Sequence, residues 1–180
     1  MKAQLLSTFF ALGTIFSTAT EADTNKNINI GLAGYALTIA YDDVFTADDD
    51  YSGTGISALY AISNNVAFRG TWYSIEHDDL PGLDNTGYDI VAYWGKGFTR
   101  HGFKAYIGGG FFRETQEFFG FKDNFSGLQI NGGIGYNWDV ISLDLTLGIR
   151  DPSDYEEFLS DFATVDAVAV SSSLILSARF

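Results

Sequence analysis

The sequence offers few side chains for proton transfer, and only one histidine has acidic neighbours. His77 precedes Asp78 and Asp79, and an imidazole beside a carboxylate is the pairing that general-base chemistry uses. No matching nucleophile accompanies it, and His101 is expected in a short turn on the opposite side of the fold. The sequence therefore predicts that His77 is a solvated loop residue, with no catalytic residue and no cofactor.

A second stretch has the spacing of metal ligands. Asp48, Asp50 and Ser52 stand at alternate positions before Gly53, which copies the opening of a calcium-binding loop. The twelfth position of this stretch is Leu59, whereas a calcium loop places a bidentate glutamate there. We therefore predict no metal site, and we expect only weak binding of divalent cations by the acidic stretches as a group.

Eight segments that could position these residues alternate apolar with polar or small side chains, as strands with one apolar face do. They cover residues 28–41, 53–63, 66–76, 87–98, 103–112, 126–138, 140–150 and 167–180. Short links alternate with long ones, and the long links are residues 42–52, 77–86, 113–125 and 151–166. This pattern predicts an all-β fold, an eight-stranded antiparallel up-and-down transmembrane β-barrel.

The first segment is irregular, because its apolar residues change parity midway. Ile28, Ile30 and Leu32 share one parity, whereas Tyr35, Leu37, Ile39 and Tyr41 share the other. One extra residue in a strand reverses the alternation, so we expect a β-bulge within residues 31–34. The bulge would place both sets on the same face.

Charged residues also occur on the strand faces expected to line the barrel interior. By parity they are Arg69, Asp89, Lys104, Asp144, Arg150 and Arg179. Buried charges need partners, so we predict an internal network of ion pairs and hydrogen bonds, joined by Tyr73, Tyr106, Gln129 and Asn131. An eight-stranded barrel is about wide enough for side chains alone, so this network should plug it.

The long links are strongly acidic and dominate a net charge of −13. The third link contributes Glu114, Glu117 and Asp123, and the other three links hold most of the remaining carboxylates. One rim of the barrel should therefore be anionic, which excludes nucleic acid as a partner and favours cations. Exposed loops that are acidic only for solubility would give the same composition.

Aromatic residues with outward parity gather near both ends of the predicted strands, as they do where a barrel meets the two membrane surfaces. The short-link side has Trp94, Phe103, Trp138 and Phe180, and the long-link side has Tyr41, Trp72, Tyr88 and Phe111. The last strand ends in outward-facing Leu174, Leu176, Ala178 and Phe180.

The N-terminus reads as a secretory signal. Lys2 precedes a mostly apolar run, and Thr20, Glu21 and Ala22 provide a cleavage site, so we predict a cleaved signal peptide at residues 1–22 and a barrel domain at residues 23–180. The chain has no cysteine and therefore no disulfide.

On the signal peptide, the strand pattern and the ending Leu174-x-Leu176-x-Ala178-x-Phe180, the chain resembles the small outer-membrane barrels of Gram-negative bacteria, of the OmpX, OmpA-barrel and opacity-protein type. The resemblance implies an integral outer-membrane protein with periplasmic termini and extracellular loops, in contact with membrane lipid and lipopolysaccharide. It also implies that the barrel-assembly machinery recognises the terminal strand. The group includes adhesins, structural proteins and lipid-A-modifying enzymes, so the resemblance indicates location better than activity. Because the sequence lacks a catalytic constellation, we predict a structural or adhesin-like role rather than an enzymatic one. The extracellular partner is not identified by the sequence.

Three other interpretations stay open. A soluble, periplasmic lipocalin-like barrel would turn the same apolar face inward around a small apolar ligand. A lipid-A-modifying barrel enzyme would use His77, and a narrow ion channel would use the internal charges.

Overall fold

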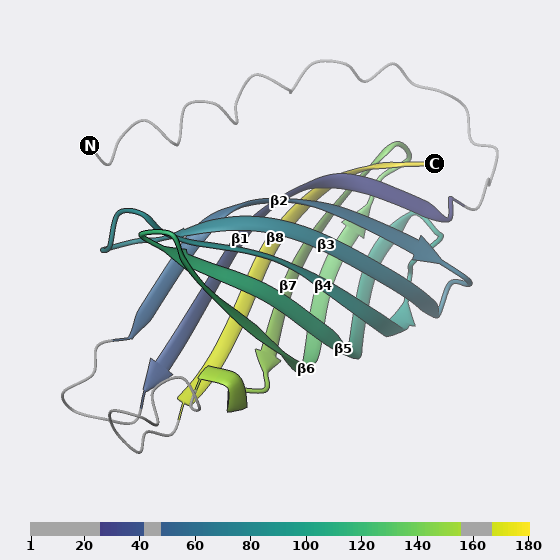
Figure 1. The fold of residues 1–180 in the computed structure, drawn as a ribbon. Coiled ribbons are helices and arrows are strands. Elements are labelled where there is room, and N and C mark those ends of the chain that lie inside the picture. The colour runs from purple at the N-terminus through teal and green to yellow at the C-terminus, as the bar shows by residue number, and fades with distance from the viewer. Residues whose placement is uncertain (1–25, 42–47, 156–166) are drawn as a thin grey trace.

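The structure is a computed structural model that describes residues 26–41, 48–155 and 167–180. Antiparallel strands pair in chain order, and β1 also pairs with β8, so the sheet closes into a barrel (Figure 1). The strands are β1 (Ile28–Tyr41), β2 (Asp49–Ala61), β3 (Val66–His77), β4 (Leu83–Lys96), β5 (Gly102–Phe118), β6 (Phe121–Asn137), β7 (Ile141–Arg150) and β8 (Ala167–Arg179). The predicted eight-stranded, all-β, up-and-down barrel is confirmed. The predicted signal peptide, residues 1–22, lies outside the described residues.

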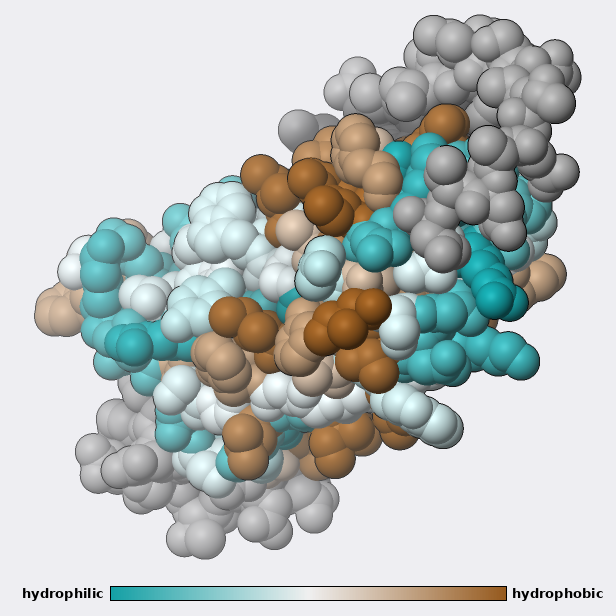
Figure 2. Space-filling model, turned by 90° about the vertical axis from the view of Figure 1, so that its right-hand side faces the viewer, coloured by the Kyte–Doolittle hydropathy of each residue, from teal (hydrophilic) through white to brown (hydrophobic). Residues whose placement is uncertain are grey.

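The barrel has an apolar outside and a polar inside. Along β7, Leu143, Leu145 and Leu147 are exposed, whereas the intervening Ser142, Asp144 and Thr146 are buried. Exposed and buried residues alternate along the other strands as well, although the buried residues of several strands include apolar clusters. Figure 2 shows hydrophobic residues across the middle of one face, with hydrophilic residues toward both sides. In the described residues, no helix is long and apolar enough to cross a membrane.

The expected bulge in the first strand is wrong. The register of β1 runs without interruption against both β2 and β8, from Ile30 through to Ile39. Ile30 and Leu32 therefore face outward, whereas Tyr35, Leu37 and Ile39 are buried inside the barrel. The large residues change sides along this strand because the interior near the long links is itself lined by an apolar cluster, to which these three side chains belong.

The strands near the long links are longer than predicted. The second link is reduced to a turn at residues 78–82, and the third to residues 119–120 between β5 and β6. Polarity was interpreted as a loop signal, but polar residues here keep the strand pairing, as Glu117 opposite Lys122 does with an ion pair of 3.0 Å. β2 likewise begins at Asp49 rather than at residue 53. The fourth link lies mostly outside the described residues.

Candidate functional site

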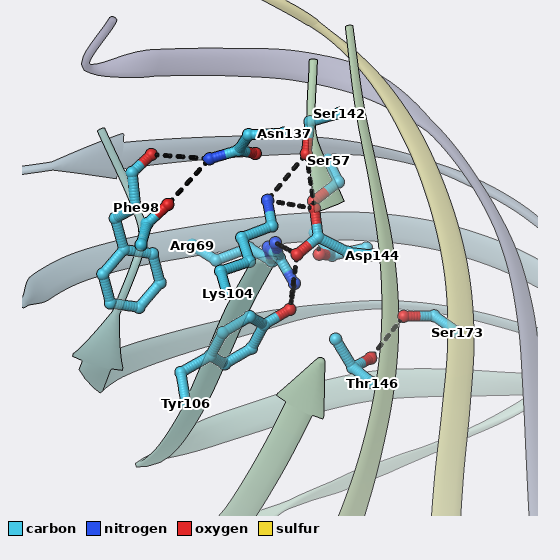
Figure 3. A network of polar contacts seen from close by, with 12 residues as sticks. Ser57, Arg69, Phe98, Lys104, Tyr106, Asn137, Ser142, Asp144, Thr146 and Ser173 are labelled. Carbon is cyan, nitrogen blue, oxygen red and sulfur yellow. Dashed lines mark hydrogen bonds and ion pairs between the residues drawn. The ribbon is translucent and has the colours of Figure 1, made fainter. Parts of the chain in front are cut away.

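One cluster of buried charges fills the half of the barrel nearest the short links, and we call it the short-turn cluster: Arg69, Lys104, Tyr106, Ser142 and Asp144. The Asp144 carboxylate on β7 accepts hydrogen bonds from Lys104 Nζ at 2.7 Å and from the Tyr106 hydroxyl at 2.7 Å (Figure 3). Arg69 Nη2 lies 3.2 Å from the same carboxylate, and Ser142 donates a further bond. A single buried anion thus joins two cations from β3 and β5.

Two glycines on β6, the strand between β5 and β7, make room for this cluster. A Cβ added at Gly133 would lie 2.5 Å from the Tyr106 ring, and one at Gly135 would lie 2.5 Å from the backbone oxygen of Leu143. Because such contacts are shorter than side chains tolerate, glycine on the inner face of β6 is a packing requirement.

A second cluster fills the half nearest the long links, and we call it the loop-side cluster: Tyr35, Tyr73, Asp89, Glu114, Arg150 and Tyr155. Arg150 lies at its centre, with Nη1 2.7 Å from Glu114 and Nη2 2.9 Å from Asp89. Its guanidinium also packs over the Phe112 ring, 4.4 Å from the centroid. The polarity is the reverse of the short-turn cluster, because here one cation joins two carboxylates.

Tyrosine hydroxyls complete the loop-side cluster. Tyr35 donates to Asp89 at 2.6 Å, and Tyr73 and Tyr155 donate to Glu114 at 2.7 and 2.6 Å. Tyr155 comes from the helical turn after β7, so it covers the cluster from the loop side. Burial, and then the Glu114 carboxylate, raise the pKa of the Tyr155 hydroxyl above its usual range, which keeps it a donor.

The structure thus brings together five of the six charges predicted for the interior, in two groups. The sixth, Arg179, is buried apart from them and donates to the backbone carbonyls of Trp138 and Thr99, where it holds two short turns together. Of the predicted polar connectors, Tyr73 and Tyr106 lie within the clusters, and Gln129 hydrogen-bonds to Asp89 and donates to the carbonyl of Phe111.

Three members of the loop-side cluster were missed in the sequence. Glu114 was assigned to an acidic loop, but it is 1% exposed and shares inward parity with Phe112. Continuing the strand alternation past residue 112 was the signal that would have found it. Tyr35 was assigned to the outer face through the expected bulge, and Tyr155 lies outside any strand pattern.

A small polar cavity separates the two clusters. Its volume is about 10 Å³, on the order of a single water position. The lining includes side chains from both clusters, Arg69 and Asp89, together with Asn131, Thr146 and Ser173. Side chains therefore fill the described interior on both sides of this cavity.

Two girdles of outward-facing aromatic residues were predicted, one near each end of the strands, and most of these residues lie exposed on the outer surface. On the short-turn side they are Trp94, Phe103, Trp138 and Phe180, and on the long-link side Trp72, Tyr88 and Phe111. The placement of Tyr41 was wrong, because it has inward parity, is half-buried and donates to Asp49 at 2.8 Å. Its position follows from the absence of the bulge.

The terminal strand lies between β7 and β1. Leu174, Leu176, Ala178 and Phe180 face outward, and the backbone N–H of Phe180 donates to Ile28 at 2.8 Å. These four residues are therefore accessible on the wall of the barrel.

His77 is part of the loop-side structure rather than a free base. Its Nδ1 accepts bonds from the backbone N–H groups of Asp79 and Leu80, both at 3.1 Å. That leaves the proton on Nε2, which donates to Asp49 at 3.2 Å. Nδ1 therefore holds the β3–β4 turn, and Nε2 joins this turn to the start of β2.

The calcium-like stretch does not converge on one point. Asp50 accepts a bond from Thr38, and Ser52 donates to Asp78 on the neighbouring hairpin. Among the described residues, no three histidine, cysteine, aspartate or glutamate side chains are grouped so that they could hold a metal ion.

No family model and no curated protein matches this sequence. Several solved structures are similar over most of the chain. Ail, the attachment invasion locus protein of Yersinia pestis, is 17% identical with a TM-score of 0.56, over 87% of this chain and 100% of that chain. Neisserial surface protein A is 17% identical with a TM-score of 0.55, over 85% and 97%.

The N-terminal β-barrel domain of Pseudomonas aeruginosa OprF is 13% identical, with a TM-score of 0.52, over 87% of this chain and 100% of that chain. At these identities the likeness establishes the fold. The chain has the fold of the small eight-stranded outer-membrane β-barrels.

Proposed function

We propose that the protein is an integral outer-membrane barrel with a non-enzymatic, structural or adhesin-like role exercised by its long-link side. The observation that carries this proposal is the combination of an apolar outer wall with a charged, filled interior. In water, an apolar wall of this extent would be an aggregation surface, whereas in a bilayer it is the surface that lipid requires.

The spacing of the aromatic residues supports insertion. From Phe103 to Phe111 the strand β5 rises roughly 3.3 Å per residue, and a tilt of about 40° gives a height on the order of 20 Å. This height is comparable to the apolar band of an outer-membrane barrel, about 25 Å. The exposed rings would lie at the two lipid–water boundaries, in contact with membrane lipid and lipopolysaccharide.

Orientation follows from the same reasoning. The start of β1 and the end of β8 lie with the short turns and would be periplasmic, and the long-link side would be extracellular (Figure 1). The outward side chains of β8 would be the surface that the barrel-assembly machinery recognises.

The charge of the long-link side selects among extracellular partners. The similar protein Ail has been crystallised with sucrose octasulfate, a heparin analogue and therefore a polyanion. Here Asp78, Asp79, Asp84 and Asp123 are exposed on the loop-side hairpins. We propose that this chain takes neutral or basic partners and repels polyanions.

The other interpretations fit the geometry less well. A lipocalin-like carrier needs an apolar cavity, whereas the cavity between the clusters is small and polar. An ion path would have to pass both clusters. A lipid-A-modifying enzyme would need His77 as a base, but its Nδ1 bonds to the β3–β4 turn and its Nε2 bonds to Asp49 of β2.

Fractionation of expressing cells, with boiled and unboiled gel electrophoresis of the membrane fraction, tests the proposal. We expect outer-membrane location and a heat-modifiable band, lost when Phe180 is deleted and kept in the matched variant Phe180→Tyr. A soluble periplasmic protein without a mobility shift would refute the proposal. A lipid A profile that changes with the gene and reverts in His77→Ala would instead identify an enzyme.

A further inference from the structure

Four exposed apolar side chains gather at the far end of the β3–β4 and β5–β6 hairpins, and we call them the aromatic tip: Leu80, Phe118, Phe119 and Phe121. Phe119 and Phe121 are 84% and 78% exposed. The two hairpins lie side by side, because Leu83 of β4 pairs with Phe118 of β5 (Figure 1). Within the second hairpin, Phe118 pairs with Phe121 of β6. The stretch from Phe111 to Phe118 is on the order of 20 Å long, so the tip stands well beyond the long-link girdle.

The backbone at the tip is strained in a way that folding does not require. Phe119 has a φ of 48° and the following Gly120 a φ of 85°. Two positive φ values make a two-residue hairpin turn in which asparagine followed by glycine is the preferred pair. A phenylalanine at the first position costs conformational energy, and its ring remains exposed beside Phe118, at 4.4 Å between centroids. A strained residue whose ring is exposed is a reason to look for a contact made outside the chain.

Carboxylates surround this apolar surface. Asp78, Asp79, Asp84 and Asp123 are exposed on the same two hairpins, whereas Glu117 and Lys122 neutralise each other in an ion pair of 3.0 Å. An apolar centre with an anionic surround is complementary to an apolar surface bordered by lysine or arginine. An anionic lipid surface would be repelled by the same carboxylates.

We propose that the aromatic tip docks a basic amphipathic segment of a partner protein, with Phe119 and Phe121 on its apolar face and the surrounding aspartates on its basic residues. This inference rests on the proposed function, since the tip is extracellular only if the barrel inserts. The segment would be helical, because a helix presents an apolar stripe flanked by basic residues. Binding energy would come mainly from the aromatic rings, and the aspartates would add attraction that salt weakens.

The test measures binding to the full barrel in nanodiscs of phosphatidylcholine. The probe is a fluorescently labelled helical peptide of leucine and lysine in amphipathic order, followed by anisotropy, with empty discs subtracted. The double variant Phe119→Asn, Phe121→Ser should bind the peptide about tenfold more weakly or worse, since it lacks the two rings that the peptide would bury. Asp84→Asn with Asp123→Asn should weaken binding several-fold at low salt, and Asp139→Asn, on the opposite rim, should change nothing.

Two further readouts separate the possible failures. A heat-modifiable band shows that a variant still folds as a barrel. A wild-type protein without such a band would contradict the proposed function, and the inference about the tip would fail with it. A peptide with glutamate in place of lysine should bind at least tenfold more weakly. Equal peptide binding by wild type and the tip double variant would overturn the inference. The inference would also be overturned if the barrel did not bind the peptide but floated with separate phosphatidylcholine vesicles in a way that depends on the tip. That result would assign the tip to a lipid surface.

Discussion

Asp144 is the anion on which the short-turn cluster depends, so we expect Asp144→Asn to destabilise the barrel strongly. Its carboxylate is fully buried and receives bonds from Lys104, Tyr106 and Ser142, with Arg69 3.2 Å away. An amide of the same shape fills the space but removes the charge that balances two buried cations. Breaking a buried pair in this way costs about 3–5 kcal/mol of unfolding free energy.

The assay is urea unfolding of the barrel in phosphatidylcholine vesicles, followed by loss of the heat-modifiable band. Ser142→Ala is the control, because it removes a neutral hydroxyl that donates to the same carboxylate and accepts from Lys104, and it should cost about 1.5–3 kcal/mol while both charges remain. A double-mutant cycle that combines Asp144→Asn with Lys104→Met measures the coupling energy between the two charges. For residues in contact this energy is roughly 0.5–3 kcal/mol.

An Asp144→Asn cost no larger than that of Ser142→Ala would refute this reasoning. It would mean that Lys104 and Arg69 find water or other partners when the anion is removed. Additive effects of Asp144→Asn and Lys104→Met would contradict the direct ion pair as well.

Other parts of the structure give three further predictions. Gly133→Val should destabilise the barrel by about 1–3 kcal/mol in the same urea assay, because the new side chain meets the Tyr106 ring, and an unchanged midpoint would contradict the packing argument. Phe119→Asn should raise the unfolding free energy by roughly 1 kcal/mol, because asparagine tolerates the positive φ, and a loss of stability would show that the ring supports the fold. Ser153 donates to Asp151 and holds the pKa of that carboxyl below its usual range, so carboxyl NMR should find a higher pKa in Ser153→Ala. This interaction stabilises the fold above the unfolded pKa of Asp151 and is lost as the pH falls through the folded one, so a pKa that does not respond would exclude the bond.

Period-two alternation was sufficient to predict the strand number, the antiparallel closure and the inward parity of the lumen charges. The signal is strong because the outer face of the strands is largely apolar while much of the inner face is polar or charged, as the exposed leucines and buried Asp144 of β7 illustrate. The alternation also placed Lys104 and Tyr106 on the face where they contact Asp144.

The sequence predictions that were wrong concern the long-link side of the barrel, where the outer surface of the strands is no longer apolar. Past the girdle, both faces of a hairpin can be polar, so alternation weakens although the strand continues, and Glu114 was taken for a loop residue. In β1 the large residues move to the inner face near the long links, so hydrophobicity alone suggested a bulge at a place where the register is continuous. Tyr155 reaches the loop-side cluster from outside the strands, and no periodicity encodes such a contact.

The two clusters carry opposite charge imbalances, and this has a consequence for function. Asp144 joins two cations near the short turns, whereas Arg150 joins the carboxylates of Asp89 and Glu114 near the long links. Each cluster is therefore centred on its own ion, and the small cavity lies between the two clusters. Because Tyr155 packs on the loop-side cluster alone, weakening the short-turn cluster should lower barrel stability without moving the loop-side hairpins. Folded Asp144→Asn should then bind the basic amphipathic peptide as wild type does, whereas a parallel loss of binding would show that the aromatic tip depends on the whole interior.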